Sequence, residues 1–332
     1  MTARWPPTIS SERTVREDHR RLGIAYRCRV IDVSLAADEA DEKRSLDVYN
    51  DVWPHDRVGL AEVRSYKASQ VGYADLLARL DGQVVGSAFA SIQPQRPELV
   101  VALVTVLPQQ RRRGAGTALY AAISDWARER KLDTIEAVVA DNDPESLAFA
   151  ERRGFVENRR EAGVALDLTV IEPPPVEPPN GVEIVTWAER PELARGMYDV
   201  ALEALPDIPG SEDEQVEPFA EWLAHEMQGS GDRPEATFVA LAGDEVVGFA
   251  KFSLTGAQPT TAHHDLTGVK RAWRGRGVAR ALKATQIAWA KANGYDQLRT
   301  RNDERNAPIR HLNDRLGYRP SIGRVYLEGP CL

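Results

Sequence analysis

Hydrophobic and polar positions change period several times along this chain, and the whole series then repeats. Strand-like apolar runs at 74–80 and 83–92 are joined by Asp81-Gly82, a dipeptide typical of hairpin turns. Residues 117–130 place Leu119, Ile123 and Trp126 on one face of a predicted helix. The other elements predicted in this part are strands at 27–33, 99–106, 134–139 and 164–170 and helices at 42–52, 60–70 and 144–153.

The same order of elements returns in the second part of the chain. Strands are predicted at 182–185, 237–241, 245–254, 262–269, 297–300 and 324–327, and helices at 191–205, 216–228, 280–293 and 307–316. Each part therefore reads β-α-α-β-β-β-α-β-α-β. This order predicts an α/β (α+β) fold with a mixed sheet and helices on both faces.

Composition divides the chain into four segments. Residues 1–25 are polar and charged and are expected to form an arm. Residues 173–181 carry five prolines, a composition typical of a stiff extended linker. We therefore expect one domain at 26–172, the first half, and a second at 182–332, the second half.

Each half contains a basic, glycine-rich loop between a predicted strand and a predicted helix. The two loops are Arg111, Arg112, Arg113, Gly114, Ala115, Gly116 and Thr117, and Arg274, Gly275, Arg276, Gly277, Val278, Ala279 and Arg280. Gly277 follows Gly114 at an offset of 163 (277 − 114 = 163), and Gly248 follows Gly86 at nearly the same offset (248 − 86 = 162). A shared offset of this size indicates a tandem duplication of one domain.

The chemistry of these loops favours a phosphate-bearing ligand. The first N–H groups of a helix have no partner within the helix, and the helix dipole attracts negative charge there. Glycine lets a phosphate approach the backbone, and arginine adds charge and donors. A glycine turn with solvated arginines is the alternative, but it is less plausible for two loops than for one.

Overall composition narrows the class of ligand. The chain has 332 residues, a net charge of -8 and a pI near 5.4, so nucleic acid and anionic membranes are not expected as partners. Cys28 and Cys331 lack metal-binding spacing and are expected to be free thiols in the cytoplasm, so we expect no metal site. No apolar run is long enough to span a membrane.

The spacing of these residues resembles the GCN5-related N-acetyltransferases (GNAT). The first half matches at Val106, Pro108, Arg111, Gly114, Gly116, Gly154 and Phe155, and the second at Thr267–Val269, Arg274, Gly277, Ala279, Asn306, Asn313 and Leu316–Tyr318. The resemblance implies acetyl-CoA as cofactor, with its pyrophosphate on the two basic loops. It also implies that the pantetheine arm pairs with strand edges at Val104 and Val106 and at Thr267 and Val269.

The resemblance also implies direct attack of an amine on the thioester, which requires a base, a polarised carbonyl and an acid for the thiolate. Many family members have a tyrosine acid four residues before the last glycine of the motif, where this chain has Ala150 and Asn313. Asparagine donates hydrogen bonds but no proton. Because residues 300–318 resemble some subfamilies closely, we expect the second half to be catalytic through Asn306 and Asn313, and the first half to bind cofactor without turnover or to be a scaffold.

Candidate bases lie on the predicted strand 262–269. Strand alternation puts His264 and Leu266 on one face and His263 and Asp265 on the other, and His264 or Asp265 is a candidate for taking the amine proton. A solvated strand end is the alternative. Glu203 belongs with a group of carboxylates that suits a cationic amine or forms a solvated acidic loop: Asp207, Glu212, Asp213 and Glu214.

The predicted partner is a small molecule with a primary amine. Peptide or antibiotic amines are alternatives within the enzymes, and a non-catalytic acyl-CoA sensor or scaffold is an alternative of another class. A dinucleotide oxidoreductase is disfavoured, because the loops do not follow the first strand and no acidic ribose ligand stands about 20 residues further on. We expect either a monomer with two pseudo-twofold related halves or a homodimer.

Overall fold

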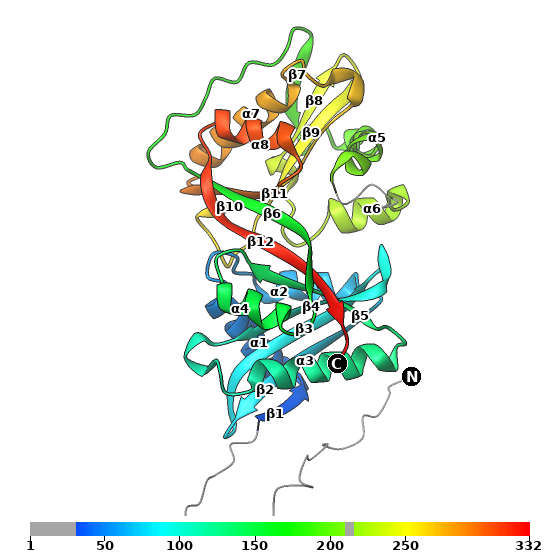
Figure 1. Cartoon of the computed structure of the whole chain (residues 1–332). Helices are drawn as coiled ribbons and strands as arrows, with labels where there is room; N and C mark the ends of the chain where they lie inside the picture. Colours follow the sequence, from blue (N-terminus) through cyan, green and yellow to red (C-terminus); the bar gives the residue numbers. More distant parts are fainter. Residues whose placement is uncertain (1–30, 210–215) are drawn as a thin grey trace, which may run out of the picture. The chain divides into compact units, whose positions relative to one another are not determined.

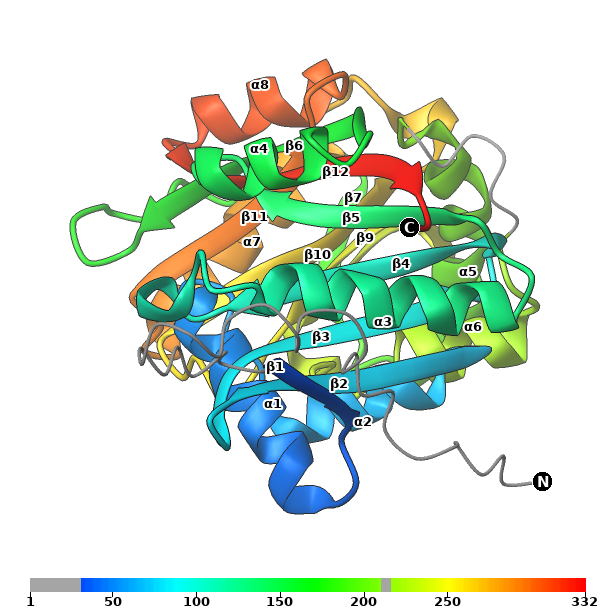
Figure 2. The ribbon, with the colours of Figure 1, turned by 60° about the horizontal axis from the view of Figure 1, so that its bottom comes forward.

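The computed structural model describes residues 31–209 and 216–332 of the chain. The first half contains strands β1 (Ile31–Leu35), β2 (Gly72–Leu80), β3 (Gln83–Gln93), β4 (Arg96–Val106), β5 (Thr134–Ala140) and β6 (Val156–Asp167). Its helices are α1 (Glu39–Val52), α2 (Leu60–Ala68), α3 (Ala115–Glu129) and α4 (Pro144–Glu151), and a 3-10 turn covers Pro108–Gln110. Helix α3 lies in front of the sheet in Figure 2, and α1 and α2 lie behind it.

The second half repeats these elements. Its strands are β7 (Val182–Thr186), β8 (Thr237–Ala242), β9 (Glu245–Ser253), β10 (Thr261–Val269), β11 (Gln297–Asp303) and β12 (Arg319–Pro330). Its helices are α5 (Ala194–Ala204), α6 (Phe219–Glu226), α7 (Val278–Ala292) and α8 (Ala307–Arg315), with 3-10 turns at Pro191–Leu193, Leu205–Asp207, Pro234–Ala236 and Arg271–Trp273.

The two halves share one twelve-stranded sheet and exchange their last strands (Figure 1). The strand order is β1-β2-β3-β4-β5-β12-β6-β11-β10-β9-β8-β7. Strand β12 of the second half pairs with β5 of the first, with Tyr326 opposite Val138. Strand β6 of the first half pairs with β11 of the second, with Val164 opposite Thr300. Each half therefore ends on a strand that the other half supplies.

Each half opens a wedge between its two parallel strands. Strand β4 pairs with β5 only over Val100–Ala102, and β10 pairs with β11 only over Thr261–His263. Both β4 and β10 continue beyond these pairs and remain hydrogen-bonded to β3 and β9 on their other side. The edges predicted to receive a pantetheine arm, at Val104–Val106 and Thr267–Val269, have no strand partner facing the wedge.

Separate hydrophobic cores support the two halves. In the first half, α3 buries Leu119, Ile123 and Trp126 against β2, β3 and β4, as its apolar spacing predicts. In the second half, α7 buries Leu282 and Ile287 in a similar core, and a further cluster packs α5 and α6 on the other face of the sheet. No helix within the described ranges is long and apolar enough to cross a membrane.

The predicted α/β fold with a mixed sheet in two tandem halves is confirmed. The largest differences are at the exchanged strands, because β6 begins at Val156 and β12 at Arg319, eight and five residues earlier than predicted. Residues 173–181 contain no helix or strand. The predicted arm at 1–25 and Cys28 lie outside the described residues, as do Glu212, Asp213 and Glu214.

Candidate active site

The basic loop of the first half is shaped to receive an anion. Gly114 precedes α3 in the left-handed conformation with φ 96°, and Arg112 has φ 63°. The N–H groups of residues 112–117 find no acceptor within the part of the chain that the structure describes, and the first bond of α3 runs from Ala118 N to Gly114 O. Free amides at a helix N-terminus suit a phosphate.

Arginines surround this loop, and two of them are free to meet a ligand. Arg111 pairs with Asp143 at 2.9 Å, and Arg153 donates to Thr117 Oγ1 at 2.7 Å. Arg112 and Arg152 are exposed and form no ion pair or side-chain hydrogen bond with other described residues. Their charge is therefore available to a phosphate.

A cavity of about 430 Å³ runs from this loop into the wedge of the first half. Arg111, Arg112, Gly114 and Gly116 lie at its polar end. Its inner wall is apolar and is made by Val104, Val106, Tyr120, Ile123, Ala137, Ala150 and Phe155. The cavity therefore joins a phosphate cradle to a free strand edge.

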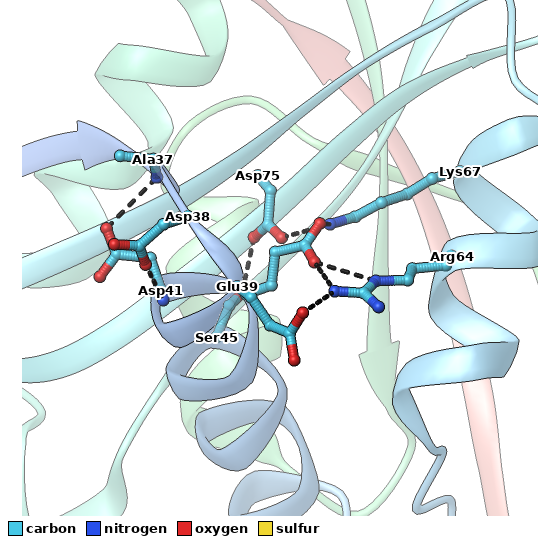
Figure 3. A network of polar contacts seen from close by, with 9 residues as sticks. Ala37, Asp38, Glu39, Asp41, Ser45, Arg64, Lys67 and Asp75 are labelled. Atoms are coloured by element: carbon cyan, nitrogen blue, oxygen red, sulfur yellow. Dashed lines mark hydrogen bonds and ion pairs between the residues drawn. The ribbon is translucent and has the colours of Figure 1, made fainter.

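A second cavity, of about 480 Å³, lies on the opposite face of β3 and β4, under α1 and α2. Aromatic side chains form much of its wall: Tyr49, Trp53, Tyr66, Phe89 and Tyr326. Its acidic end is part of the network in Figure 3, where Lys67 pairs with Asp75 at 2.8 Å and with Glu42 at 3.1 Å, and Ser45 donates to Asp75 at 2.6 Å. Burial acts to lower the pKa of Lys67, but the two carboxylates outweigh it and raise that pKa.

One carboxylate of this cavity stands apart from the network. Glu62, on the first turn of α2, lines the cavity and has no ion pair or hydrogen bond with another described residue. The Ser91 hydroxyl, also in the lining, is buried without a hydrogen-bond partner in the described structure. An unpaired carboxylate and an unsatisfied hydroxyl in the wall of one cavity suit a ligand with N–H groups.

The two cavities meet where β4 and β5 separate. Trp53, Ala102 and Val138 line both of them. A ligand under the basic loop and one beneath α1 and α2 would therefore be neighbours at these three residues. Such proximity is the condition for transfer of a group between two bound molecules.

The equivalent wedge of the second half is filled by hydrogen-bonded polar side chains. His264 is buried and stacks near Phe252, and its Nε2 lies 2.5 Å from the Tyr318 hydroxyl. Its Nδ1 lies 3.0 Å from Gln286 Oε1, which only accepts, so Nδ1 carries the proton and Tyr318 donates to Nε2. Burial, with the charge of Lys283, holds the pKa of His264 well below its usual value, so the ring is neutral.

Lys283 completes this filling cluster. Its side chain is 1% exposed, and Nζ lies 5.4 Å from the centroid of the Tyr318 ring. Burial lowers the pKa of Lys283 from 10.5 to about 7. Burial also raises the pKa of Tyr318.

The five residues predicted to perform the chemistry do not form one site. Asn313 is buried and donates to Asn302 Oδ1 at 2.8 Å, and Asn306 stands before α8 without a side-chain capping bond. Asp265 pairs with the buried Lys251 at 2.7 Å, on the side of α6. Glu203 accepts the Arg271 backbone N–H at 2.9 Å.

The predicted alternation of side chains along β10 is wrong at one point. A register shift between His264 and Thr267 inserts a bulge, so His264 faces α7 whereas Leu266 packs with the cluster of α5 and α6. A bulge reverses the alternation of the residues that follow it. His264 and Asp265 therefore do not meet at a common cleft.

The basic loop of the second half keeps the backbone shape, but Arg274 and Arg280 lie against carboxylates, whereas Arg276 lies over the Trp273 ring. Gly277 has φ 96°, and the N–H groups of residues 275–280 have no acceptor in the described ranges. Asp207 pairs with Arg271 at 2.7 Å and with Arg274 at 2.6 Å, and Glu177 of the linker lies 3.7 Å from Arg280. A cavity of about 550 Å³ in this half lies elsewhere, between 187–191 and 227–235.

The sequence patterns do not predict the residues that line the second cavity of the first half, among them Trp53, Glu62, Arg324 and Tyr326. The available signal was the aromatic and acidic composition of 42–66. No local signal could place Arg324 and Tyr326 there, because they arrive by strand exchange.

Comparisons with known proteins agree with this architecture. The acetyltransferase (GNAT) family model matches residues 34–155 and 195–318. A mycothiol acetyltransferase from Acidothermus cellulolyticus is 29% identical over 258 residues, covering 73% of each chain. A GCN5-related N-acetyltransferase from Sphaerobacter thermophilus has a similar structure, with a TM-score of 0.71 at 21% identity, covering 91% of this chain and 96% of that one. A tandem GNAT protein from the clavulanic acid biosynthesis pathway gives a TM-score of 0.70 at 20% identity, covering 91% and 99%.

Proposed function

Because this chain belongs to the acetyltransferase (GNAT) family and is an N-acetyltransferase, we propose that its first half binds acetyl-CoA and transfers the acetyl group to a primary amine of a small molecule. The observation that carries this proposal is that two cavities, one under the free loop amides and one under α1 and α2, meet at Trp53, Ala102 and Val138. The second half is proposed as a scaffold.

The residues of the first cavity fit acetyl-CoA. The amides of residues 112–117 with Arg112 and Arg152 would hold the phosphates, and the free edge of β4 at Val104–Val106 would pair with the pantetheine arm. When bound, acetyl-CoA would supply a thioester carbon to which the amine nitrogen bonds as the C–S bond breaks. An acceptor bound as an ammonium loses two protons, and in this proposal both pass to solvent, one before the attack and one as the C–N bond forms. The thiolate takes up one proton from solvent, because Ala150 gives none.

The second cavity is proposed to hold the acceptor. Its aromatic walls suit the apolar body of an amine, and Glu62 offers an unpaired carboxylate to an ammonium group. Glu42 and Asp75 already share Lys67, which leaves Glu62 as the carboxylate with most freedom to attract an ammonium group. The similarity to a mycothiol acetyltransferase supports a small-molecule acceptor.

A CoA-release assay with a panel of primary amines tests the proposal. Two matched variants put a carboxylate into one loop each, Gly116→Glu in the first half and Ala279→Glu in the second. A Cβ on Gly116 would lie 3.5 Å from Phe149 and 3.7 Å from Val106, which are ordinary contacts, and both positions are in the first turn of a helix where an acid is tolerated. We expect Gly116→Glu to abolish release and Ala279→Glu to preserve it.

The opposite pattern would assign the chemistry to the second half. Binding of acetyl-CoA without release across the whole panel would favour the alternative of a non-catalytic acyl-CoA sensor. That alternative has one structural observation in its favour, the alanine at position 150.

Glu62→Gln tests the acceptor cavity separately. We expect the KM for the amine to rise about tenfold, because a charge-assisted contact is lost, while the Kd for acetyl-CoA stays the same. Glu39→Gln is the matched control, since Glu39 pairs with Arg64 in the network of Figure 3 but does not line the cavity. An equal change in KM for both variants would contradict the role given to Glu62.

A further inference from the structure

The segment 53–59, between α1 and α2, forms part of the wall of the acceptor cavity. Trp53 and Val58 line that cavity, and Trp53 also lines the cofactor cavity. Within the first half the segment is held by Asn50, which donates to Val58 O at 3.0 Å and accepts from Val58 N at 2.9 Å. Its middle, at His55 and Asp56, is held from elsewhere.

The second half makes the contacts that hold this middle part. From β11, Arg299 donates to His55 O at 3.2 Å and to His55 Nδ1 at 3.3 Å, and Arg301 pairs with Asp56 Oδ1. From the connection between β9 and β10, Gln258 donates to Arg57 O at 2.9 Å. Three consecutive loop residues are thus bound by three side chains from the other half.

The exchanged strand adds a fourth contact that reaches the cavity itself. Arg324 of β12 pairs with Asp56 Oδ2 at 3.2 Å, and its guanidinium carbon lies 5.6 Å from the centroid of the Trp53 ring. Arg324 also lines the acceptor cavity, next to Tyr326 of the same strand. The second half therefore binds segment 53–59 and also supplies part of the wall of the acceptor cavity.

Asp56 is the centre of this arrangement. Its side chain is 8% exposed and accepts from two guanidinium groups, one on each oxygen. Burial acts to raise the pKa of Asp56, but the charges of Arg301 and Arg324 outweigh it and lower that pKa, so the carboxylate stays ionised. Removing its charge would leave two partly buried cations facing each other, which costs more than the loss of a surface pair.

We propose that the second half serves the first as a clamp: Arg299, Arg301 and Arg324 fix segment 53–59 through His55 and Asp56, and so set the shape of the acceptor cavity. Asp56 and Arg301 are positioning residues, since they act on the substrate through Trp53 and Val58. The kinetic consequence rests on the proposed function of the first half, whereas the structural consequence does not.

Hydrogen–deuterium exchange on the full chain tests the clamp directly. In Asp56→Asn, and more weakly in Arg299→Gln, we expect the amides of 53–59 to exchange about tenfold faster, with 110–117 unchanged. Glu328→Gln is the matched control, because Glu328 also bridges β12 to the first half, through Arg96 at 2.9 Å, but lies away from the segment. Unchanged exchange at 53–59 in both clamp variants would overturn the proposal. Arg299→Gln is included in case Asp56→Asn folds poorly, because the contacts of Arg299 with His55 are exposed.

Steady-state kinetics supply the second readout. We expect Asp56→Asn to raise the KM for the amine about tenfold while the Kd for acetyl-CoA changes less than about threefold, because the phosphate loop is untouched. Glu328→Gln should leave both constants unchanged, even if it lowers Tm. Faster exchange with an unchanged KM would overturn the link to the acceptor cavity. Absence of turnover in the wild type would contradict the proposed function, and the exchange result would still decide whether the clamp exists.

Discussion

The wedges of the two halves have the same backbone arrangement, but side chains line a cavity in the first wedge and fill the second. Both lie between parallel strands that pair over three residues and then separate, and both begin at a glycine with φ 96°. In the first half the wedge opens into a cavity, and in the second it is filled. At the shared offset of 163, Lys283 replaces Tyr120, Gln286 replaces Ile123 and Tyr318 replaces Phe155.

One position shows most directly how the difference arises. Ala102 of β4 lies opposite Ala90 on β3, and His264 of β10 lies opposite Phe252, the residue at the equivalent position of β9 (252 − 90 = 162). The alanine leaves room where the two cavities meet, whereas the imidazole occupies that place and bonds to Tyr318 and Gln286. We therefore propose that the side chains deeper in the wedge, and not the basic loop alone, decide whether a half can hold a ligand.

The largest effect should come from closing the first wedge. Ala102→Trp would fill the junction of the two cavities, and we expect kcat/KM to fall at least about a hundredfold, because the reacting groups could no longer meet. CoA release measures this, with Tm as the check on folding. The contrasting change, His264→Ala, opens the second wedge and should leave turnover within about twofold, because His264 lines neither cavity of the proposed site. Comparable losses of turnover in both variants would erase the distinction between the halves.

A smaller effect is expected from the buried lysine. Lys283→Met should stabilise the protein at pH 7 by at least about 2 kcal/mol, because an ammonium group no longer needs to be buried or discharged. Since the pKa of Lys283 is lowered to about 7 when folded and is 10.5 otherwise, the unfolded chain binds the extra proton between these values. Wild-type stability should therefore gain from this group as pH rises from 7 to 10, by up to about 1.4 kcal/mol per pH unit.

Denaturant unfolding at pH 7 and pH 9.5 measures this slope. The neighbouring groups titrate outside the window, because the lowered pKa of His264 acts below pH 6.5 and the raised pKa of Tyr318 acts above pH 10. The Met variant should lose the slope. An equal pH slope in both proteins would show that Lys283 is not buried as described.

The smallest expected effect concerns the N-terminal capping of the short helices α4 and α8. Asp143 accepts from Ser146 N at 3.1 Å at the start of α4 and also holds Arg111, whereas Asn306 makes no side-chain capping bond at the start of α8. Asp143→Ala should cost about 1 kcal/mol of unfolding free energy, and Asn306→Ala only a few tenths. Denaturant titration compares them, and equal costs would remove this difference.

The fold was predictable because its signals are local. Apolar periodicity, Asp81-Gly82 and the glycines before α3 and α7 predicted helices and strands close to those observed, and the repeat at 163 predicted the tandem architecture. The strand exchange was not predictable, because β6 and β12 look alike as strands and local sequence does not say which sheet each one joins. The expectation that the second half is catalytic rests on the motif at 300–318, and Tyr318 of that motif bonds to the buried His264.

Only the phosphate loop of the candidate site could be predicted from the sequence, and the acceptor cavity could not. Residues 111–117 carry a signature that can be recognised without a structure, because the phosphate cradle is a local backbone feature. The acceptor cavity combines Glu62 of α2, Ser91 of β3 and Arg324 of β12, which are distant in sequence and share no motif. The bulge after His264 also hid the true direction of that side chain, since alternation is only a guide in an uninterrupted strand.

Calorimetric titration of the full chain with acetyl-CoA tests whether only the first wedge binds the cofactor. We expect one site per chain in the wild type, lost in Gly116→Glu and kept in Ala279→Glu. Two sites in the wild type, or a single site lost only in Ala279→Glu, would show that the second wedge binds the cofactor and would contradict the division between the halves.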